Sequence, residues 1–96
     1  MYAAVRRYEG INDDDEAARL VRDSFMPQLE KVQGFIAYYW IDAGEGIMAS
    51  LSVFEDKAGA DESVKFAHKW IEENAPNLFP NPPEVTEGVV VASDTR

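Results

Sequence analysis

The stretch that decides the fold is FIAYYWID at residues 35–42, followed by AGEG at 43–46 and IMASLSVFE at 47–55. Both outer runs are rich in aromatic and β-branched residues, and the connection between them has hairpin length and two glycines. The two runs are therefore predicted to pair as antiparallel strands. A loop of two or four residues gives a register that matches Tyr38 with Leu51 and Trp40 with Ala49.

This register divides the side chains of the hairpin into two faces. One face is wholly apolar or aromatic and includes Tyr38 and Trp40. The opposite face is also too apolar to be left in water, and it carries Phe35, Tyr39, Ile41, Met48 and Phe54. Another surface is expected to cover it. Because side chains alternate along a strand, a slip of one residue would turn Tyr38 and Trp40 to the other face.

Further strands and helices are predicted on both sides of this hairpin. Before it, residues 2–8 have the composition of a strand, and a helix is predicted from Asp13 to Gly34, with a kink at Pro27. After it, residues 61–75 carry an apolar arc at helical spacing, centred on Val64, Ala67, Ile71 and Ala75. A proline-rich connector then leads to a last strand at residues 85–92.

The order strand, helix, strand, strand, helix, strand predicts an α+β, ferredoxin-like βαββαβ fold. In this fold two helices cover one face of a four-stranded antiparallel sheet. The chain has 96 residues, too few for a second independent core, so residues 1–96 are expected to form one domain. The other face of the sheet is then open to a partner.

Charge and composition argue against several functions. Nine Lys and Arg residues against eighteen Asp and Glu residues give a net charge of −9, which repels nucleic acids and anionic membranes. With no cysteine and one histidine, we expect no disulfide, no protein-built metal site and no bound cofactor. The longest apolar run, residues 35–41, is far shorter than the roughly 20 residues of a membrane helix. We therefore expect a cytoplasmic protein with neither nucleic acid nor membrane as a partner.

Arg6 and Arg7 are neighbours on the first predicted strand, so their side chains point to opposite faces. Unless this strand lies at an edge, one of them must lie against an apolar side or a subunit interface, and the residues alone leave open which one. A buried arginine needs a carboxylate or an anionic ligand beside it. The two interpretations are an ion pair with an acidic residue of a helix or of a partner subunit, and a clamp for a ligand carboxylate.

Several short motifs resemble those of a known superfamily. They are Gly34-Phe35, Tyr38-Tyr39, the glycine-rich hairpin, Ser52-Val53-Phe54-Glu55, Ser63, Ala67 and Trp70-Ile71. Together they resemble the dimeric α+β-barrel superfamily, and within it the antibiotic biosynthesis monooxygenase-like (ABM-like) domains. The resemblance covers nearly the whole chain. It implies a homodimer whose protomers close their open sheet faces against each other as a dimeric α+β barrel, with a cavity between helices and sheet in each protomer.

Activities within this family differ. Some members oxidise polyketide-derived phenols without metal or flavin, others degrade haem, and many have no known activity. This sequence has Phe54 where the family often has a tryptophan, and residues 2–8 lack the asparagine of the active members. The family's histidine on the second helix is matched by His68, which is also the only residue here that could serve as an axial haem ligand. The resemblance therefore implies the fold more strongly than the oxygen chemistry.

Four residues are candidates for a functional site. His68 lies at the border of the apolar arc, where it could take a proton from a phenol or enol near neutral pH. Tyr38, Trp40 and Trp70 are expected to shape a pocket for a planar molecule. The alternative is that these aromatic residues belong to the core and that His68 has no role.

Two functions are consistent with these observations. The first is a small homodimeric ABM-like domain that binds a small apolar or aromatic molecule and acts as a cofactor-independent monooxygenase. The second is a non-enzymatic dimerisation or ligand-sequestering module. A cavity beside Tyr38 and Trp40 would favour the first function, whereas a filled core would favour the second.

Overall fold

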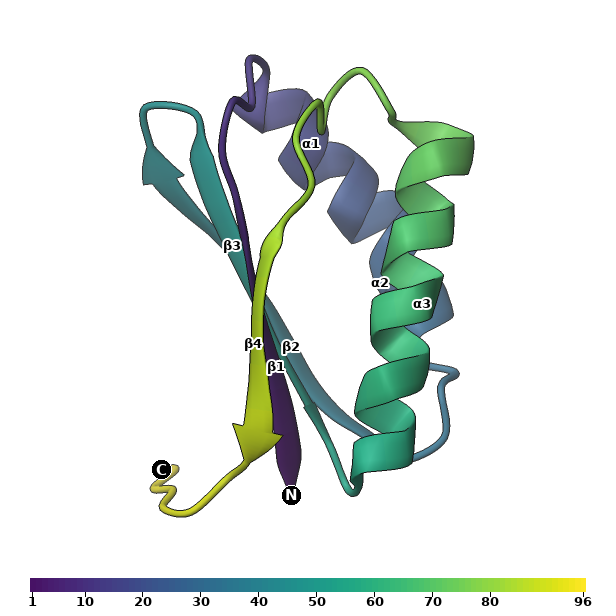
Figure 1. Cartoon of the computed structure of the whole chain (residues 1–96), viewed down its shortest axis with the longest axis vertical. Helices are drawn as coiled ribbons and strands as arrows, with labels where there is room; N and C mark the ends of the chain where they lie inside the picture. The colour runs from purple at the N-terminus through teal and green to yellow at the C-terminus, as the bar shows by residue number, and fades with distance from the viewer.

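Four strands form one antiparallel sheet, and all the helices lie on the same side of it (Figure 1). The computed structural model describes residues 1–96. Its elements, in chain order, are β1 (Tyr2–Tyr8), α1 (Asp14–Leu20), the π-helical turn η1 (Val21–Phe25), α2 (Met26–Leu29), β2 (Phe35–Gly44), β3 (Ile47–Phe54), α3 (Lys57–Asn74) and β4 (Glu84–Val89). The strands lie in the order β2-β3-β1-β4, which confirms the predicted ferredoxin-like βαββαβ fold.

The first helical segment runs without a break through α1, η1 and α2. It begins where the Asp13 carboxylate accepts the backbone N–H of Glu16 at 3.1 Å. Pro27 lies at the start of α2, directly after the π-helical turn. Because proline lacks a backbone N–H, the wider turn before it accommodates the missing helical hydrogen bond. The predicted distortion at Pro27 thus takes the form of a π-helical turn.

α3 begins at Lys57, four residues earlier than the predicted start at Asp61. The reason is an N-cap, since the Asp56 carboxylate accepts the backbone N–H of Gly59 at 3.1 Å. Gly59 is needed there because a Cβ atom would lie 2.8 Å from the Gln33 carbonyl oxygen. No helix in the structure is long and apolar enough to cross a membrane. β4 is also shorter than predicted and ends at Val89.

The predicted register of the β2-β3 hairpin is wrong by one residue over most of its length. Phe35 pairs with Phe54 as expected, but Tyr38 pairs with Ser52 and Trp40 with Ser50. Two register irregularities of the β-bulge kind, between Asp42 and Gly44 and between Phe35 and Ala37, bound the shifted stretch. Tyr38 and Trp40 therefore still lie on the helix side, as predicted. On β3, by contrast, the side chains that face the helices are those that the predicted register placed on the open side.

The side of the sheet that faces away from the helices is apolar, as predicted, and it carries Tyr39 and Ile41 as expected, but its other residues differ from the prediction. Met48 and Phe54, expected there, are fully buried under the helices, and Phe35 packs edge-on against Phe54. The open face, as we call this side, instead carries Val5, Tyr39, Ile41, Leu51 and Val53. Tyr39 is 56% exposed and Ile41 49% exposed, so large apolar groups lie in solvent.

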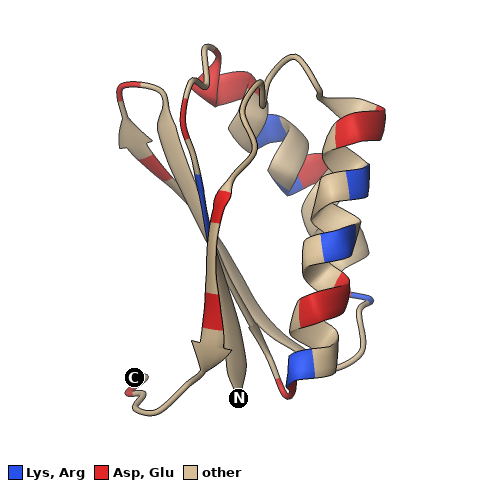
Figure 2. Cartoon of the chain, in the orientation of Figure 1, with Lys and Arg blue, Asp and Glu red and all other residues tan.

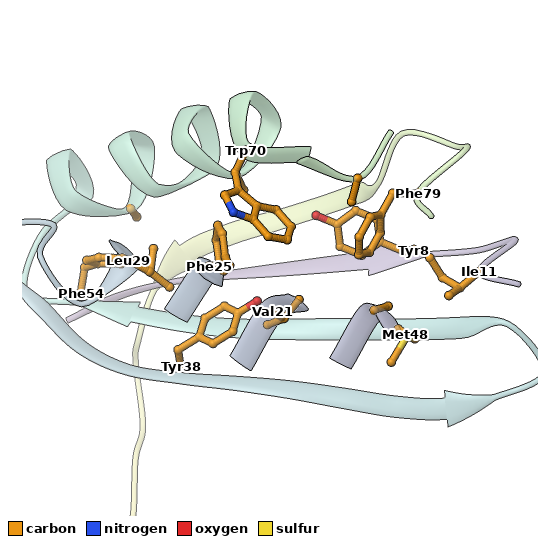
Figure 3. Close-up of a cluster of buried hydrophobic side chains, with 14 residues drawn as sticks. Tyr8, Ile11, Val21, Phe25, Leu29, Tyr38, Met48, Phe54, Trp70 and Phe79 are labelled. Carbon is orange, nitrogen blue, oxygen red and sulfur yellow. The ribbon is translucent and has the colours of Figure 1, made fainter. Parts of the chain in front are cut away.

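An aromatic cluster fills the space between the sheet and the helices (Figure 3). Phe25, from the π-helical turn, lies with its ring centroid 5.3 Å from Trp70 of α3 and 5.6 Å from Tyr38 of β2. Tyr8 contacts Phe79 of the proline-rich connector, with ring centroids 5.1 Å apart. Because these rings come from the sheet, from both helical segments and from the connector, the cluster fixes the distance between α3 and the sheet.

Candidate functional site

Three of the four predicted site residues meet in this cluster. Tyr38, Trp40 and Trp70 line one small space between helices and sheet, with a volume of about 10 Å³. That volume holds about one water molecule. Trp70 donates its indole N–H to the Ser24 hydroxyl at 3.0 Å, and Tyr38 is only 9% exposed. In this conformation the three aromatic residues therefore pack as core and leave no room for a planar ligand among them.

A much larger space lies immediately beside the core. It is a groove of about 580 Å³ between α3 and the proline-rich connector that leads to β4. We call it the α3 groove. Its walls are Val64, Lys65, His68, Ile71 and Glu72 of α3, the connector residues Pro76 and Phe79 to Pro83, and Val85. Five residues line both this groove and the small space: Arg6, Tyr8, Ala67, Ile71 and Phe79.

His68, the proposed proton acceptor, lies on the wall of the α3 groove and away from Tyr38 and Trp40. Its side chain is 75% exposed, and its Nε2 lies 2.9 Å from a carboxylate oxygen of Glu72. The predicted apolar arc placed His68 too close to the core, because Ser63, Ala67 and Trp70 are the residues that α3 buries. The carboxylate of Glu72 can orient the imidazole toward the groove.

Arg6 is the arginine that the fold buries, and Arg7 is the exposed one. Arg7 makes an ion pair with Glu9 at 3.1 Å on the outside of the sheet. Arg6 is 2% exposed, lies 5.9 Å from the centre of the Phe25 ring, and donates to the Ser63 carbonyl oxygen at 3.4 Å. No carboxylate of this chain lies within 4.0 Å of its guanidinium nitrogens. The ion pair predicted within the chain is therefore absent.

Three buried polar atoms have no hydrogen-bond partner: Arg6 Nε, Ser50 Oγ and Trp40 Nε1. Their residues form one row across three strands, because Ser50 of β3 pairs with Arg6 of β1 on one side and with Trp40 of β2 on the other. We call these residues the polar row. Sequence reasoning missed Ser50 because the predicted register placed it on the open face. The available signal was the alternation of side chains along residues 47–54, because the odd-numbered or the even-numbered residues could equally face the helices.

Burial controls the titration of the two tyrosines beside the polar row. It raises the pKa of Tyr38 to about 12, and the positive charge of Arg6 opposes this rise. Burial also raises the pKa of Tyr8, again against the opposing effect of Arg6. Both hydroxyl groups are therefore neutral at pH 7 and able to donate hydrogen bonds.

Charges around the groove are mixed. Figure 2 shows both basic and acidic residues along α3, whereas the charged residues of β4 are acidic only. The charged residues that line the α3 groove are Arg6, Lys65 and Glu72, with His68 as a third cation when it is protonated. No group of three or more His, Asp or Glu side chains in the structure could hold a metal ion. The groove is thus more positive than a chain of net charge −9 would suggest.

No protein-family model and no curated protein sequence matches this chain. Solved structures do match. NE2512, a protein of unknown function from Nitrosomonas europaea, has a TM-score of 0.80 at 19% identity over 99% of this chain and 93% of its own. A monooxygenase from the gene ActVA-Orf6 of Streptomyces coelicolor, in complex with the ligand nanaomycin D, has a TM-score of 0.75 at 13% identity over 99% and 91% of the two chains.

Other similar structures bear on the assembly and on the predicted resemblance. A dimeric ferredoxin-like protein from an uncultured marine organism has a TM-score of 0.67 at 12% identity and covers 99% of this chain and 97% of its own. Proteins proposed to be antibiotic biosynthesis monooxygenases, from Nitrosomonas europaea, Chloroflexus aurantiacus and Bordetella bronchiseptica, match as well. At these identities the likeness concerns the fold. This chain has the ferredoxin-like fold of the antibiotic biosynthesis monooxygenase-like proteins, as its sequence motifs predicted.

Proposed function

We propose that the protein is a homodimeric domain that binds a small, largely apolar or aromatic molecule in the α3 groove. The observation that carries this proposal is the groove itself, because about 580 Å³ lies within the range of small-molecule sites. Tyr8, Ala67, Ile71 and Phe79 offer an apolar or aromatic surface on the side of the core. The connector is rich in proline, so this wall loses little conformational entropy when a ligand binds.

The proposed partner on the open face is a second copy of this chain. Tyr39 of β2, Leu51 of β3 and Val5 of β1 are neighbours across three strands, and Ile41 extends this apolar patch along β2. Monomeric proteins rarely leave such a patch in water. A structurally similar protein is described as dimeric and ferredoxin-like. The same face would meet itself in a two-fold dimer, which is the commonest symmetry of small homo-oligomers.

The reaction that we propose for the bound molecule is oxygenation without a cofactor. His68, oriented by Glu72, would remove a proton from a phenol or enol, and the resulting anion is electron-rich enough to be oxidised by O₂. In a balanced reaction, O₂ places one oxygen atom on a CH₂ carbon of the substrate and the other leaves as water with the two hydrogens. The similar structure of a monooxygenase with nanaomycin D bound supports this choice of chemistry.

A non-enzymatic ligand-sequestering or dimerisation module is the second candidate. Two observations favour it: Tyr38 and Trp70 are packed in the core, and His68 is exposed. Such a protein would bind a ligand in the groove or form the dimer without consuming oxygen.

Oxygen uptake with 1,8-dihydroxy-9-anthrone, a planar phenol, separates the two candidates. We expect the protein to accelerate uptake over buffer and His68→Ala to lose about 100-fold or more of this rate, since a general base contributes roughly that much. Lys69→Ala is the matched control, because Lys69 also pairs with a glutamate one turn away but does not line the groove. Unchanged turnover in His68→Ala would remove the proposed base. Anthrone binding without oxygen uptake would support sequestration instead.

A further inference from the structure

We propose that the polar row binds a negatively charged oxygen of the ligand, a carboxylate or an ionised phenol or enol, while the apolar body of the ligand lies in the α3 groove. The inference rests on the proposed function, since it names the chemical class of the molecule that the groove takes. Its basis is the placement of Arg6, Ser50 and Trp40 side by side on the helix side of the sheet, each with an unpartnered polar atom.

The first argument is the free-energy cost of burying the charge of Arg6. A guanidinium is always charged in proteins, and a buried charge is costly unless it is paired. Arg6 has one long hydrogen bond to a carbonyl oxygen, one aromatic neighbour and the neutral hydroxyl groups of Tyr8 and Tyr38 beside it, but no carboxylate. Such an arrangement is poor for stability and suits a site where an anion arrives from outside.

The second argument is the chemistry of the surrounding groups. Arg6 Nε and Trp40 Nε1 can only donate hydrogen bonds, and the Ser50 hydroxyl can donate as well. The hydroxyl groups of Tyr8 and Tyr38, both close enough to Arg6 for its charge to act on them, are neutral donors. A site with two groups that only donate, three hydroxyl groups that can donate and no carboxylate favours an acceptor, and most strongly a negatively charged one.

The third argument is the shape of the available space. The small space of about 10 Å³, lined by Arg6 and Trp40, accommodates one oxygen-sized group but no ring. It shares Arg6, Tyr8 and Phe79 with the α3 groove, so these residues form the boundary between the two spaces. A ligand with a ring in the groove can therefore place one charged oxygen against Arg6.

A carboxylate from the partner subunit is a poor alternative for the proposed dimer. Arg6 lies on the helix side of the sheet, whereas the second copy is expected to cover the open face. The sheet itself separates the two. The anion is thus expected to come through the α3 groove, where Glu72 is the only acidic residue on the walls.

Calorimetric titration with 2-naphthoate and with neutral 2-naphthamide tests this proposal. Both probes have the same ring system, so they differ mainly in charge. We expect 2-naphthoate to bind about tenfold or more tightly, since a hydrogen bond to a charged group contributes that much or more. Arg6→Met should bind both probes equally, while Arg22→Met, which removes an exposed charge next to Asp23, should keep the preference.

Equal binding by the native protein, or a preference that survives in Arg6→Met, would overturn the inference and leave the groove proposal intact. Binding of neither probe would contradict both.

Thermal denaturation without ligand supplies an independent measurement. Because Arg6 is buried without a counter-charge, Arg6→Met is expected to raise Tm by several degrees. If Arg6 were instead needed to hold α3 through the Ser63 carbonyl, the same substitution would lower Tm. A lower Tm accompanied by weaker binding of both probes would identify a structural residue and overturn the inference.

Discussion

Tyr38 offers the sharpest test of whether the space beneath the helices is packed or open. Its pKa is raised by burial from 10.0 to about 12. A raised pKa means that the folded protein holds the Tyr38 proton more tightly than the unfolded chain does. The corresponding stability is fully present below pH 10 and is lost as the pH rises from about 10 through about 12. Two pKa units at about 1.36 kcal/mol each give a total loss of about 2.7 kcal/mol, of which roughly 2 kcal/mol is lost by pH 12.

The assay is urea denaturation of the native protein and of Tyr38→Phe at pH values from 8 to 12. Other alkaline titrations act on both proteins, so they cancel in the difference between the two free energies of unfolding. That difference should stay constant below pH 10. Between pH 10 and pH 12 the native protein should lose about 2 kcal/mol of stability relative to Tyr38→Phe. An absorbance titration at 295 nm should show one tyrosine fewer ionising near pH 12 in the variant. If Tyr38 ionises near pH 10 in the native fold, its hydroxyl is hydrated and the packed-core interpretation is wrong.

Two further substitutions test the packing of α3 and the assembly. Gly59→Ala should cost about 1–3 kcal/mol in chemical denaturation, because the new Cβ would lie 2.8 Å from the Gln33 carbonyl oxygen. Gly88→Ala, with nothing within 4 Å, is the matched control, and an equal loss in both would argue against close packing as the cause. Ile41→Glu should shift the protein from dimer to monomer in sedimentation equilibrium, with its far-UV circular dichroism unchanged, because an unpaired carboxylate would be buried in the interface. A dimer of undiminished stability would place the interface elsewhere.

Local patterns were sufficient to predict the fold. The strand at residues 2–8, the hairpin and the order of the elements were predicted correctly because each depends on short-range signals: β-branched runs, glycine positions and helical periodicity. The start of α3 was missed because Asp56 acts as an N-cap and Gly59 is required by a tertiary contact with Gln33, which no local pattern contains. This error concerns a boundary and leaves the topology unchanged.

The site was less predictable because it depends on register and on how α3 is rotated. The pairing between the two register irregularities of the hairpin places Ser50 on the helix side instead of the open face, next to Arg6 and Trp40. Strand alternation predicts that one of the two N-terminal arginines is buried, and this is confirmed. Which of the two is buried depends on the side of the sheet that the helices cover, and that could not be predicted from the strand alone. His68 was placed nearer the core than it lies, since Trp70 takes the buried position on α3.

The most direct test of the central claim is a crystal structure of the protein grown with 2-naphthoate. We expect two copies joined through their open faces, each with the naphthalene ring in the α3 groove and a carboxylate oxygen within roughly 2.7–3.2 Å of Arg6 Nε. A structure in which the groove stays empty at saturating 2-naphthoate, and in which Arg6 instead contacts a carboxylate of the partner subunit, would contradict the account.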